Sequence, residues 1–212
     1  MLNEIYRDGF YVTSIPREEA DRLLALVKAD TFLPDRPGNP AIAAWESDNP
    51  SHNNNVPVEY MAFMEALGSG PDMEHLRCHM GAFSRINVML QRGKIGDSMS
   101  WHHDSYDPMH VVCMLYLSED TWAPDDGGEL WIGHGDVDEK GFLLDPGAVE
   151  VKGRVQPNHG TLVWCLNTNP RWVHSVSKIV ADKCRYSLIG QFGYRENVLR
   201  SNIRSRYGDT WR

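Results

Sequence analysis

The spacing of hydrophobic residues changes part-way along the chain. In the first third, four apolar residues recur at the i, i+3, i+4 and i+7 positions of one helix face: Ala20, Leu23, Leu24 and Val27. From Phe83 onward, apolar residues gather instead in short runs that are separated by turn residues. The pattern therefore predicts helices first and strands afterwards.

The N-terminal part is expected to contain one short strand and three helices. Phe10, Tyr11 and Val12, within the segment Ile5 to Val12, are typical of a strand. Pro16, with two glutamates close behind it, predicts the start of a helix over residues 16–29. Further helices are expected over Val58 to Leu67 and over Asp72 to His79. Between them, residues 31–57 carry five prolines and form a long irregular segment, which suits either a surface loop or a lid.

The remaining pattern predicts a β-rich core. Seven β-type runs follow Phe83, separated by clusters of Gly, Pro and Asp: 86–90, 111–117, 130–132, 148–151, 161–164, 173–176 and 186–189. Repeated short strands with turns between them are typical of a sandwich or barrel. Leading helices followed by strands indicate an α+β, mainly β protein with N-terminal helices packed on the β-core.

The length of 212 residues is that of one domain, because barrels and sandwiches of this size are often undivided. We expect a single domain over 1–212, with 1–82 as helical and loop support, 83–194 as the β-core and 195–212 as a tail. The tail is rich in arginine. The sequence leaves open whether it is a flexible arm, a cover over the site or an oligomer contact.

The charge of the chain narrows the range of partners. Lys and Arg number 21 against 29 Asp and Glu, a formal net charge of −8. This argues against a general nucleic-acid surface or an anionic-membrane surface. No run approaches the ~20 apolar residues of a membrane span, no signal peptide is visible at the start, and the four cysteines show no CxxC spacing. We therefore expect a cytoplasmic protein with reduced thiols.

The stretch Trp101 to Asp104 carries candidate metal ligands. On a strand, side chains alternate between faces, so His102 and Asp104 point the same way and His103 points away. An imidazole and a carboxylate on one face can hold one metal ion. With a second histidine they would complete the set of two histidines and one carboxylate that binds non-haem Fe(II) and leaves positions open.

The second half of the chain offers a third ligand and an anion-binding pair. His174 lies on a predicted strand 70 residues after Asp104, a separation that a folded-back β-core can close. Eleven residues later, Arg185 and Ser187 share one strand face. A guanidinium binds a carboxylate bidentately, and a neighbouring hydroxyl adds a donor. The pair suits the far carboxylate of a dicarboxylic acid whose other end chelates the metal.

The ordered set His102-x-Asp104, Gly127-Gly128-Glu129-Leu130, His174 and Arg185-x-Ser187 resembles the 2-oxoglutarate/Fe(II)-dependent dioxygenases, in their prolyl-4-hydroxylase-like branch. The resemblance covers about residues 83–194. It implies a double-stranded β-helix (jelly-roll, cupin-like) core, with His102, Asp104 and His174 as the catalytic iron ligands. It also implies Arg185 and Ser187 as the co-substrate site, and Fe(II), 2-oxoglutarate and O2, with ascorbate as an optional addition. The implied reaction hydroxylates an unactivated C–H bond and releases succinate and CO2.

The chain departs from that branch at two positions. Gly93 and Met99 stand nine and three residues before His102, where tyrosines are typical. Gln91 or Asn87 is expected to replace the missing hydrogen bond to the co-substrate, and Met99 alters the wall beside the metal.

Single residues argue against two related classes of enzyme. Asp104 argues against the radical halogenases, which lack this carboxylate. Gln191 stands six residues after Arg185, where the nucleic-acid demethylases expect a second arginine. A demethylase and a non-catalytic β-barrel that binds a metal or ligand remain as alternative hypotheses. A hydrolytic zinc site would need a general base, and the sequence offers none beside the metal.

The substrate is expected to be an amino-acid-like small molecule or a peptidyl residue, with prolyl among the options. Five residues near the motifs are candidates for the substrate pocket: Met99, Trp101, Trp131, Arg171 and Trp172. Arg171 in particular could anchor a substrate carboxylate. Neither a nucleic acid nor a membrane is expected as a partner, and the oligomeric state is left open.

Overall fold

The computed structural model describes residues 5, 7–34, 36–46, 56–71, 73–74, 83–103, 109–138, 143–166 and 171–194. Several predictions fall outside these residues. They concern the ligand Asp104, most of the helix expected over 72–79, and the tail 195–212. The division into a single domain likewise stays a prediction.

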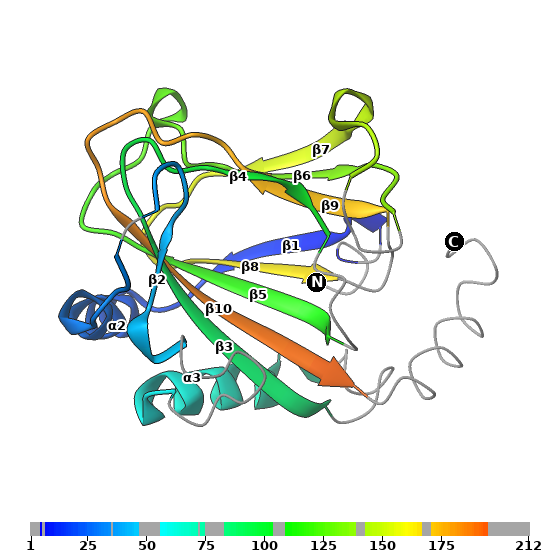
Figure 1. The fold of residues 1–212 in the computed structure, drawn as a ribbon. Coiled ribbons are helices and arrows are strands. Elements are labelled where there is room, and N and C mark those ends of the chain that lie inside the picture. The colour runs from blue at the N-terminus through cyan, green and yellow to red at the C-terminus, as the bar shows by residue number, and fades with distance from the viewer. Residues whose placement is uncertain are drawn as a thin grey trace.

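Two antiparallel sheets face each other and form the body of the molecule (Figure 1). The larger has the order β1 (Phe10–Ser14), β8 (Thr161–Leu166), β5 (Met109–Leu117), β10 (Arg185–Tyr194), β3 (Phe83–Gly93) and β2 (Ala41–Ile42). The smaller has the order β4 (Met99–His102), β9 (Trp172–Val176), β6 (Leu130–His134) and β7 (Glu150–Val155). Each of the seven runs predicted after Phe83 overlaps a strand, and most are shorter than the strand itself. The run 148–151 starts too early, because Ala148 ends a 3₁₀ helix and β7 begins at Glu150.

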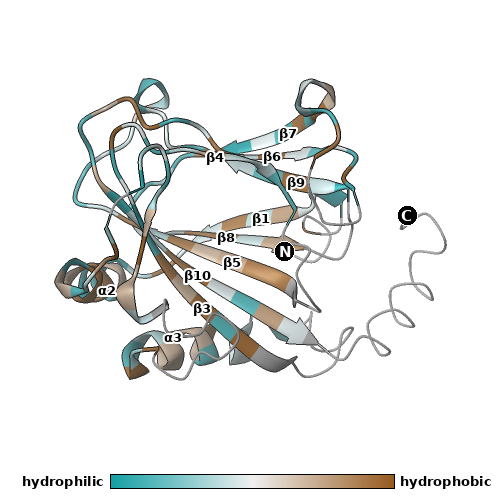
Figure 2. Cartoon of the chain, in the orientation of Figure 1, coloured by the Kyte–Doolittle hydropathy of each residue, from teal (hydrophilic) through white to brown (hydrophobic). Residues whose placement is uncertain are grey.

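The central strand β5 shows how the chain builds two cores. Its residues are buried on both faces, and Figure 2 shows it largely in brown. Alternate residues from Val111 to Leu117 join the cluster beneath the helices. The intervening Val112, Met114 and Tyr116 join the cluster between the two sheets. A strand that is apolar throughout is therefore placed between two layers.

The two helices cover the outer face of the larger sheet (Figure 1). Helix α2 (Arg17–Ala29) follows Pro16, and it buries the four predicted apolar residues. Helix α3 (Val58–Ser69) extends two residues beyond the prediction and is fixed in the core by Tyr60, Phe63 and Met64. The prediction of N-terminal helices packed on a β-core is confirmed. No helix in the described part of the chain is long and apolar enough to span a membrane.

Part of the proline-rich segment 31–57 is ordered as a sheet edge. Phe32 bridges to Ala43, and β2 pairs with β3 through Ala41 and Ile42. A short 3₁₀ helix, Ala44–Glu46, follows. Residues 47–55 lie outside the described ranges, so a lid function for them stays a prediction.

Candidate functional site

A cavity of about 350 Å³ opens between the two sheets. The larger sheet contributes side chains from β3, β5 and β10, and the smaller sheet contributes them from β4, β6 and β9. The lining includes His102, His174, Arg185 and Ser187, so the structure brings together the predicted metal-binding and co-substrate-binding residues that it describes, Gln91 included.

His102 and His174 are direct neighbours on adjacent strands. They are Cα partners in the pairing of β4 with β9, and their ring centroids lie 4.2 Å apart. A bulge between Met99 and His102 shifts the register of β4, and the imidazole of His102 lines the cavity. Both rings are therefore available to one metal ion in the cavity.

The orientation of the His102 ring is set by the backbone of its own strand. Its Nδ1 lies 2.7 Å from the carbonyl oxygen of Ser100. Since a carbonyl only accepts, Nδ1 carries the proton, and Nε2 carries the lone pair that coordinates a metal. A hydrogen bond of this kind is the usual support of a metal-binding histidine.

The third predicted ligand, Asp104, lies outside the described residues. Within those residues no three His, Cys, Asp or Glu side chains meet in a metal-binding group. The neighbouring His103 is buried, with 8% of its surface exposed. Its expected role as a spacer between the two ligands stays a prediction.

Arg185 lies at one end of the cavity and is almost fully buried, with 2% of its surface exposed. Its Nη1 donates to the Ser187 hydroxyl at 3.0 Å, whereas Nε has no hydrogen-bond partner. Burial lowers the pKa of this guanidinium from its ordinary value, although Tyr116 and Asp97 oppose the shift. A buried cation with an unused donor fits a carboxylate ligand, because the anion would supply the missing charge and bond.

Tyr116 is a member of the site that the sequence analysis missed. Its ring lies 5.2 Å from the Arg185 guanidinium carbon, and burial raises the pKa of its hydroxyl to about 12. The hydroxyl therefore keeps its proton at neutral pH and can donate to an anion. Alternation in the predicted strand 111–117 places Tyr116 on one face with Val112 and Met114, a signal that could have found it.

The two candidates for the missing co-substrate hydrogen bond occupy different places. Gln91 is the register partner of Ser187 and lies beside the Arg185 end. Asn87 is the partner of Gln191, and its side-chain nitrogen donates to the Gln191 side-chain oxygen at 2.9 Å. Gln91 thus lies near the anion-binding residues, while Asn87 belongs to a separate amide pair.

The substrate residues suggested by the sequence are scattered. Met99 lines the cavity. Trp131 points away from Leu130, which lines the cavity, and its ring lies 6.4 Å from that of Trp101. Trp172 is buried in the core between the sheets, and Arg171 is exposed, with its Nε 3.3 Å from an Asp136 oxygen.

The Gly127-Gly128-Glu129 stretch forms a tight turn before β6. Both glycines have positive φ, 73° and 71°, and a Cβ on Gly127 would lie 1.9 Å from the Lys178 carbonyl oxygen. The Glu129 carboxylate accepts from Trp131 Nε1 at 2.9 Å and Gln156 Nε2 at 2.6 Å. The stretch therefore shapes the entry to β6 and does not line the cavity.

The comparisons with known proteins agree with this geometry. The model of the 2OG-Fe(II) oxygenase superfamily matches residues 84–193. A search of curated proteins gives no match. A prolyl-4-hydroxylase from Pseudomonas putida is similar at 22% identity and a TM-score of 0.62, covering 92% of this chain and 97% of that chain.

Two further solved structures share the fold. A prolyl hydroxylase from Trichoplax adhaerens, in complex with a peptide of hypoxia inducible factor, has 17% identity and a TM-score of 0.60, and covers 94% of this chain and 90% of that chain. A prolyl 4-hydroxylase from Phytophthora capsici has 17% identity and a TM-score of 0.57, and covers 92% and 61%. The predicted jelly-roll core is confirmed.

Proposed function

Because the chain belongs to the 2OG-Fe(II) oxygenase superfamily, we propose that it hydroxylates an unactivated C–H bond of an amino-acid-like small molecule or a peptidyl residue. One observation carries the proposal. The paired His102 and His174 share a cavity with a buried arginine that has an unused donor. A metal and a dicarboxylic acid fit together in such a space.

Membership of this superfamily implies an oxidoreductase that uses Fe(II), 2-oxoglutarate and O2. When bound, iron and 2-oxoglutarate would supply the oxidising power, since decarboxylation to succinate and CO2 activates O2 for attack on a C–H bond. Ascorbate as an additional reductant and a cytoplasmic location stay predictions.

Three side chains are proposed to hold the metal: His102, His174 and Asp104. Two histidines and one carboxylate on one face of the ion leave positions open for other ligands. The Ser100 carbonyl keeps His102 in the tautomer that this role needs.

The far carboxylate of the diacid is proposed to bind at the Arg185 end. Arg185 supplies the charge, and Ser187, Tyr116 and Gln91 add neutral donors around it. The larger sheet also lines the cavity with apolar side chains, among them Met89, Met114 and Ile189. These exclude water and so strengthen the ionic contact with Arg185.

The Asn87–Gln191 pair is proposed to face the substrate. Gln191 lies four residues beyond Ser187 along β10, about 13 Å at the usual strand rise. A five-carbon diacid has four C–C bonds of about 1.5 Å each, so it is too short to bridge that distance. The pair carries no charge, and it suits an uncharged polar group such as an amide.

The supporting evidence for the substrate class is of two kinds. The Trichoplax prolyl hydroxylase is complexed with a peptide, which favours a peptidyl substrate. A net charge of −8, together with Gln191 where a demethylase expects arginine, favours a protein that does not bind nucleic acid. We therefore place nucleic-acid demethylation below hydroxylation.

The first test is anaerobic addition of Fe(II) and 2-oxoglutarate to the purified protein. A visible charge-transfer band is expected in the wild type and should be absent in His174→Ala. His134→Gln is the matched control, because His134 is in the same sheet but does not line the cavity. No band in the wild type, or a full band in His174→Ala, would contradict the proposal.

The second test supplies O2 and measures succinate. Free amino acids are compared with proline-containing peptides, and release should rise with one class and not with the other. A band without any succinate release, with or without these compounds, would favour the alternative of a non-catalytic metal- and ligand-binding barrel.

A further inference from the structure

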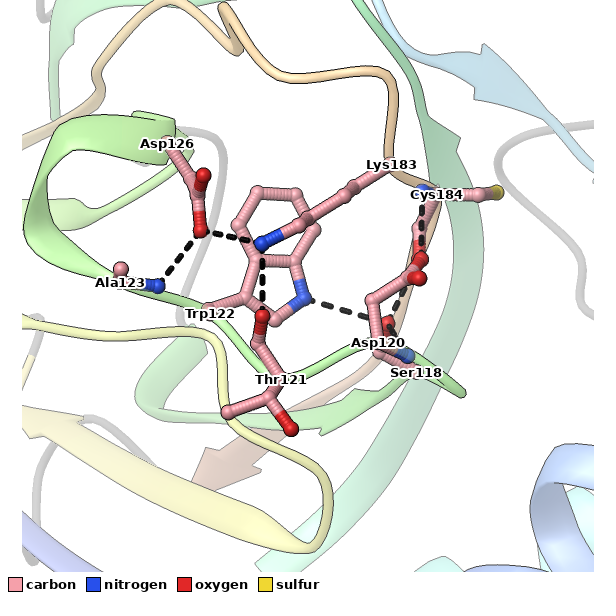
Figure 3. Close-up of polar contacts among 8 residues, drawn as sticks. All are labelled: Ser118, Asp120, Thr121, Trp122, Ala123, Asp126, Lys183 and Cys184. Atoms are coloured by element: carbon pink, nitrogen blue, oxygen red, sulfur yellow. Dashed lines mark hydrogen bonds and ion pairs between the residues drawn. The ribbon is translucent and has the colours of Figure 1, made fainter.

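Arg185 begins β10 directly after Cys184, a residue whose backbone N–H and C=O groups are both hydrogen-bonded to side chains. We propose that Ser118 and Asp120 are positioning residues for the co-substrate: they fix the Cys184 backbone, which places Arg185 for the far carboxylate. This inference rests on the proposed function, because it takes Arg185 as the carboxylate-binding residue. We refer to Ser118, Asp120 and the Cys184 backbone as the Cys184 clamp (Figure 3).

The clamp engages both backbone polar groups of Cys184. The Ser118 hydroxyl donates to the Cys184 carbonyl oxygen at 2.7 Å. An oxygen of the Asp120 carboxylate accepts from the Cys184 N–H at 3.2 Å. Two bonds from a neighbouring loop therefore define the backbone of the residue next to Arg185.

Ser118 is itself held in one orientation. Its Oγ accepts from the Asp120 N–H and from Trp122 Nε1, both at 3.1 Å. Together with the bond to Cys184, these contacts use the one donor and both lone pairs of the hydroxyl. Ser118 is 3% exposed, so no water would replace a lost partner easily.

An outer layer of contacts ties the same two loops together. Lys183 Nζ donates to the Thr121 carbonyl oxygen at 2.8 Å and contacts an Asp126 oxygen at 2.5 Å. The same Asp126 oxygen accepts from the Ala123 N–H at 2.6 Å. Figure 3 shows this layer beside the clamp, on the Trp122 ring. The clamp is thus the inner part of a continuous network.

Along the chain, the clamp lies close to Tyr116, which lines the cavity. Ser118 comes two residues after Tyr116, whose ring lies against the Arg185 guanidinium. One short stretch therefore contacts the Arg185 side chain and also holds the backbone of the preceding residue, Cys184. The guanidinium itself makes one hydrogen bond, to Ser187, and its Nε has no partner, so its placement also depends on the packing against Tyr116 and on the clamp.

Small displacements of a binding group are costly, and about 1 Å can reduce an activity 10²-fold. Loss of the Ser118 hydroxyl leaves one carbonyl and two N–H groups without their partner. We expect Ser118→Ala to weaken 2-oxoglutarate binding by about tenfold, the effect of about 1.4 kcal/mol.

The experiment compares two probes on the anaerobic Fe(II)-loaded protein: 2-oxoglutarate, and 2-oxopentanoate, which lacks the far carboxylate. In Ser118→Ala, the Kd of 2-oxoglutarate should rise about tenfold, while that of 2-oxopentanoate stays unchanged. Ser118→Thr keeps the hydroxyl and should restore the preference. Asp120→Asn keeps an acceptor and should bind better than Asp120→Ala.

Ser177→Ala is the matched control. The Ser177 hydroxyl accepts from the Glu129 N–H at 3.0 Å, so it also holds a loop backbone, but it does so next to β6. This variant should leave the ratio of the two Kd values unchanged. Thermal unfolding of each variant reports how much general stability is lost.

Three results would contradict the proposed role of the clamp. Ser118→Ala could weaken both probes equally, as a purely structural residue would, or it could weaken neither. If the wild type itself binds 2-oxopentanoate as tightly as 2-oxoglutarate, the assignment of Arg185 in the proposed function fails, and the clamp fails with it.

Discussion

One end of the cavity holds a buried guanidinium, and the other holds a pair of side-chain amides. At the first end Arg185 shares the cavity lining with Ser187, Tyr116 and Gln91, and a neighbouring loop holds the backbone of the preceding residue, Cys184. At the second end the Asn87–Gln191 pair carries no charge and one hydrogen bond joins its members. Both ends are built on the same strands, β3 and β10.

The difference between the ends matches two kinds of recognition. A fixed positive charge in an apolar surrounding favours an anionic partner, because an anion compensates the buried charge and a neutral group does not. Neutral amides discriminate less strongly by charge and more by hydrogen-bond pattern. In the proposed function, the Arg185 end therefore binds the co-substrate and the amide end faces the substrate.

Arg185→Leu is expected to have the largest effect on 2-oxoglutarate binding. Among the described cavity-lining side chains of the larger sheet it removes the one that carries a charge. Binding of 2-oxoglutarate should weaken at least about 100-fold, as for truncation of a buried ion pair. The Kd measured by calorimetry with the Fe(II)-loaded protein checks this.

Arg185→Lys is the informative companion. It keeps the charge but loses the bidentate geometry, so an intermediate loss is expected. The melting temperature of Arg185→Leu should be equal to the wild type or higher, since a buried charge without a counter-ion is removed. An unchanged Kd for 2-oxoglutarate in Arg185→Leu would remove the distinction between the two ends.

Tyr116→Phe tests the neutral part of the Arg185 end. A hydrogen bond to a charged group contributes about 1.5–3 kcal/mol, so 2-oxoglutarate affinity should fall by at least about tenfold. The Kd for 2-oxopentanoate, without the far carboxylate, should not change. An equal loss for both compounds would mean that Tyr116 supports the fold and does not donate to the ligand.

Arg185 and Ser187 could be predicted as a pair from the sequence because their geometry is local. Residues two apart on a strand share a face, so Arg185 with Ser187 follows from one segment. The pairing of His102 with His174 needed a longer inference, from the ordered motif. The structure then places the two as direct register partners.

The amide end could not be predicted because it depends on register between distant segments. Asn87 and Gln191 are 104 residues apart, and a shift of one residue between β3 and β10 would separate them. The bulge in β4 likewise has no local signal, and it lets Met99 and His102, three residues apart, both line the cavity. Trp101, in contrast, could have been placed on the opposite face from the sequence, because side chains alternate along a strand and His102 is its neighbour.

A pair of matched glutamine variants tests whether the two ends bind separate ligands. Gln191→Leu should raise the substrate KM by about fivefold, the effect of one neutral hydrogen bond of about 1 kcal/mol, and leave the Kd for 2-oxoglutarate unchanged. Gln91→Leu should raise the Kd for 2-oxoglutarate and leave the substrate KM unchanged. Succinate release under O2 gives the first quantity and calorimetry the second. If both variants change the same quantity, the two ends do not have separate ligands.

The smallest expected effect concerns stability at alkaline pH, to which the Arg185 end contributes through Tyr116 and the amide end does not contribute. Burial raises the pKa of Tyr116 from 10.0 to about 12. Between these values the unfolded state loses the proton and the folded state keeps it. The unfolded state then binds fewer protons, so the free energy of unfolding falls as pH rises. At pH 10.5 this amounts to about 0.8 kcal/mol, or about 2 °C in melting temperature.

Melting temperatures between pH 9 and 11 check this by comparing wild type with Tyr116→Phe. Burial also raises the pKa of Tyr186 and of Cys113 to about 12, but these groups titrate in both proteins and cancel in the difference. The wild type should lose stability more steeply than Tyr116→Phe above pH 10, while Gln191→Leu keeps the wild-type slope because an amide does not titrate. Parallel curves for wild type and Tyr116→Phe would show that the Tyr116 hydroxyl reaches water, and that the Arg185 end is less closed than its burial indicates.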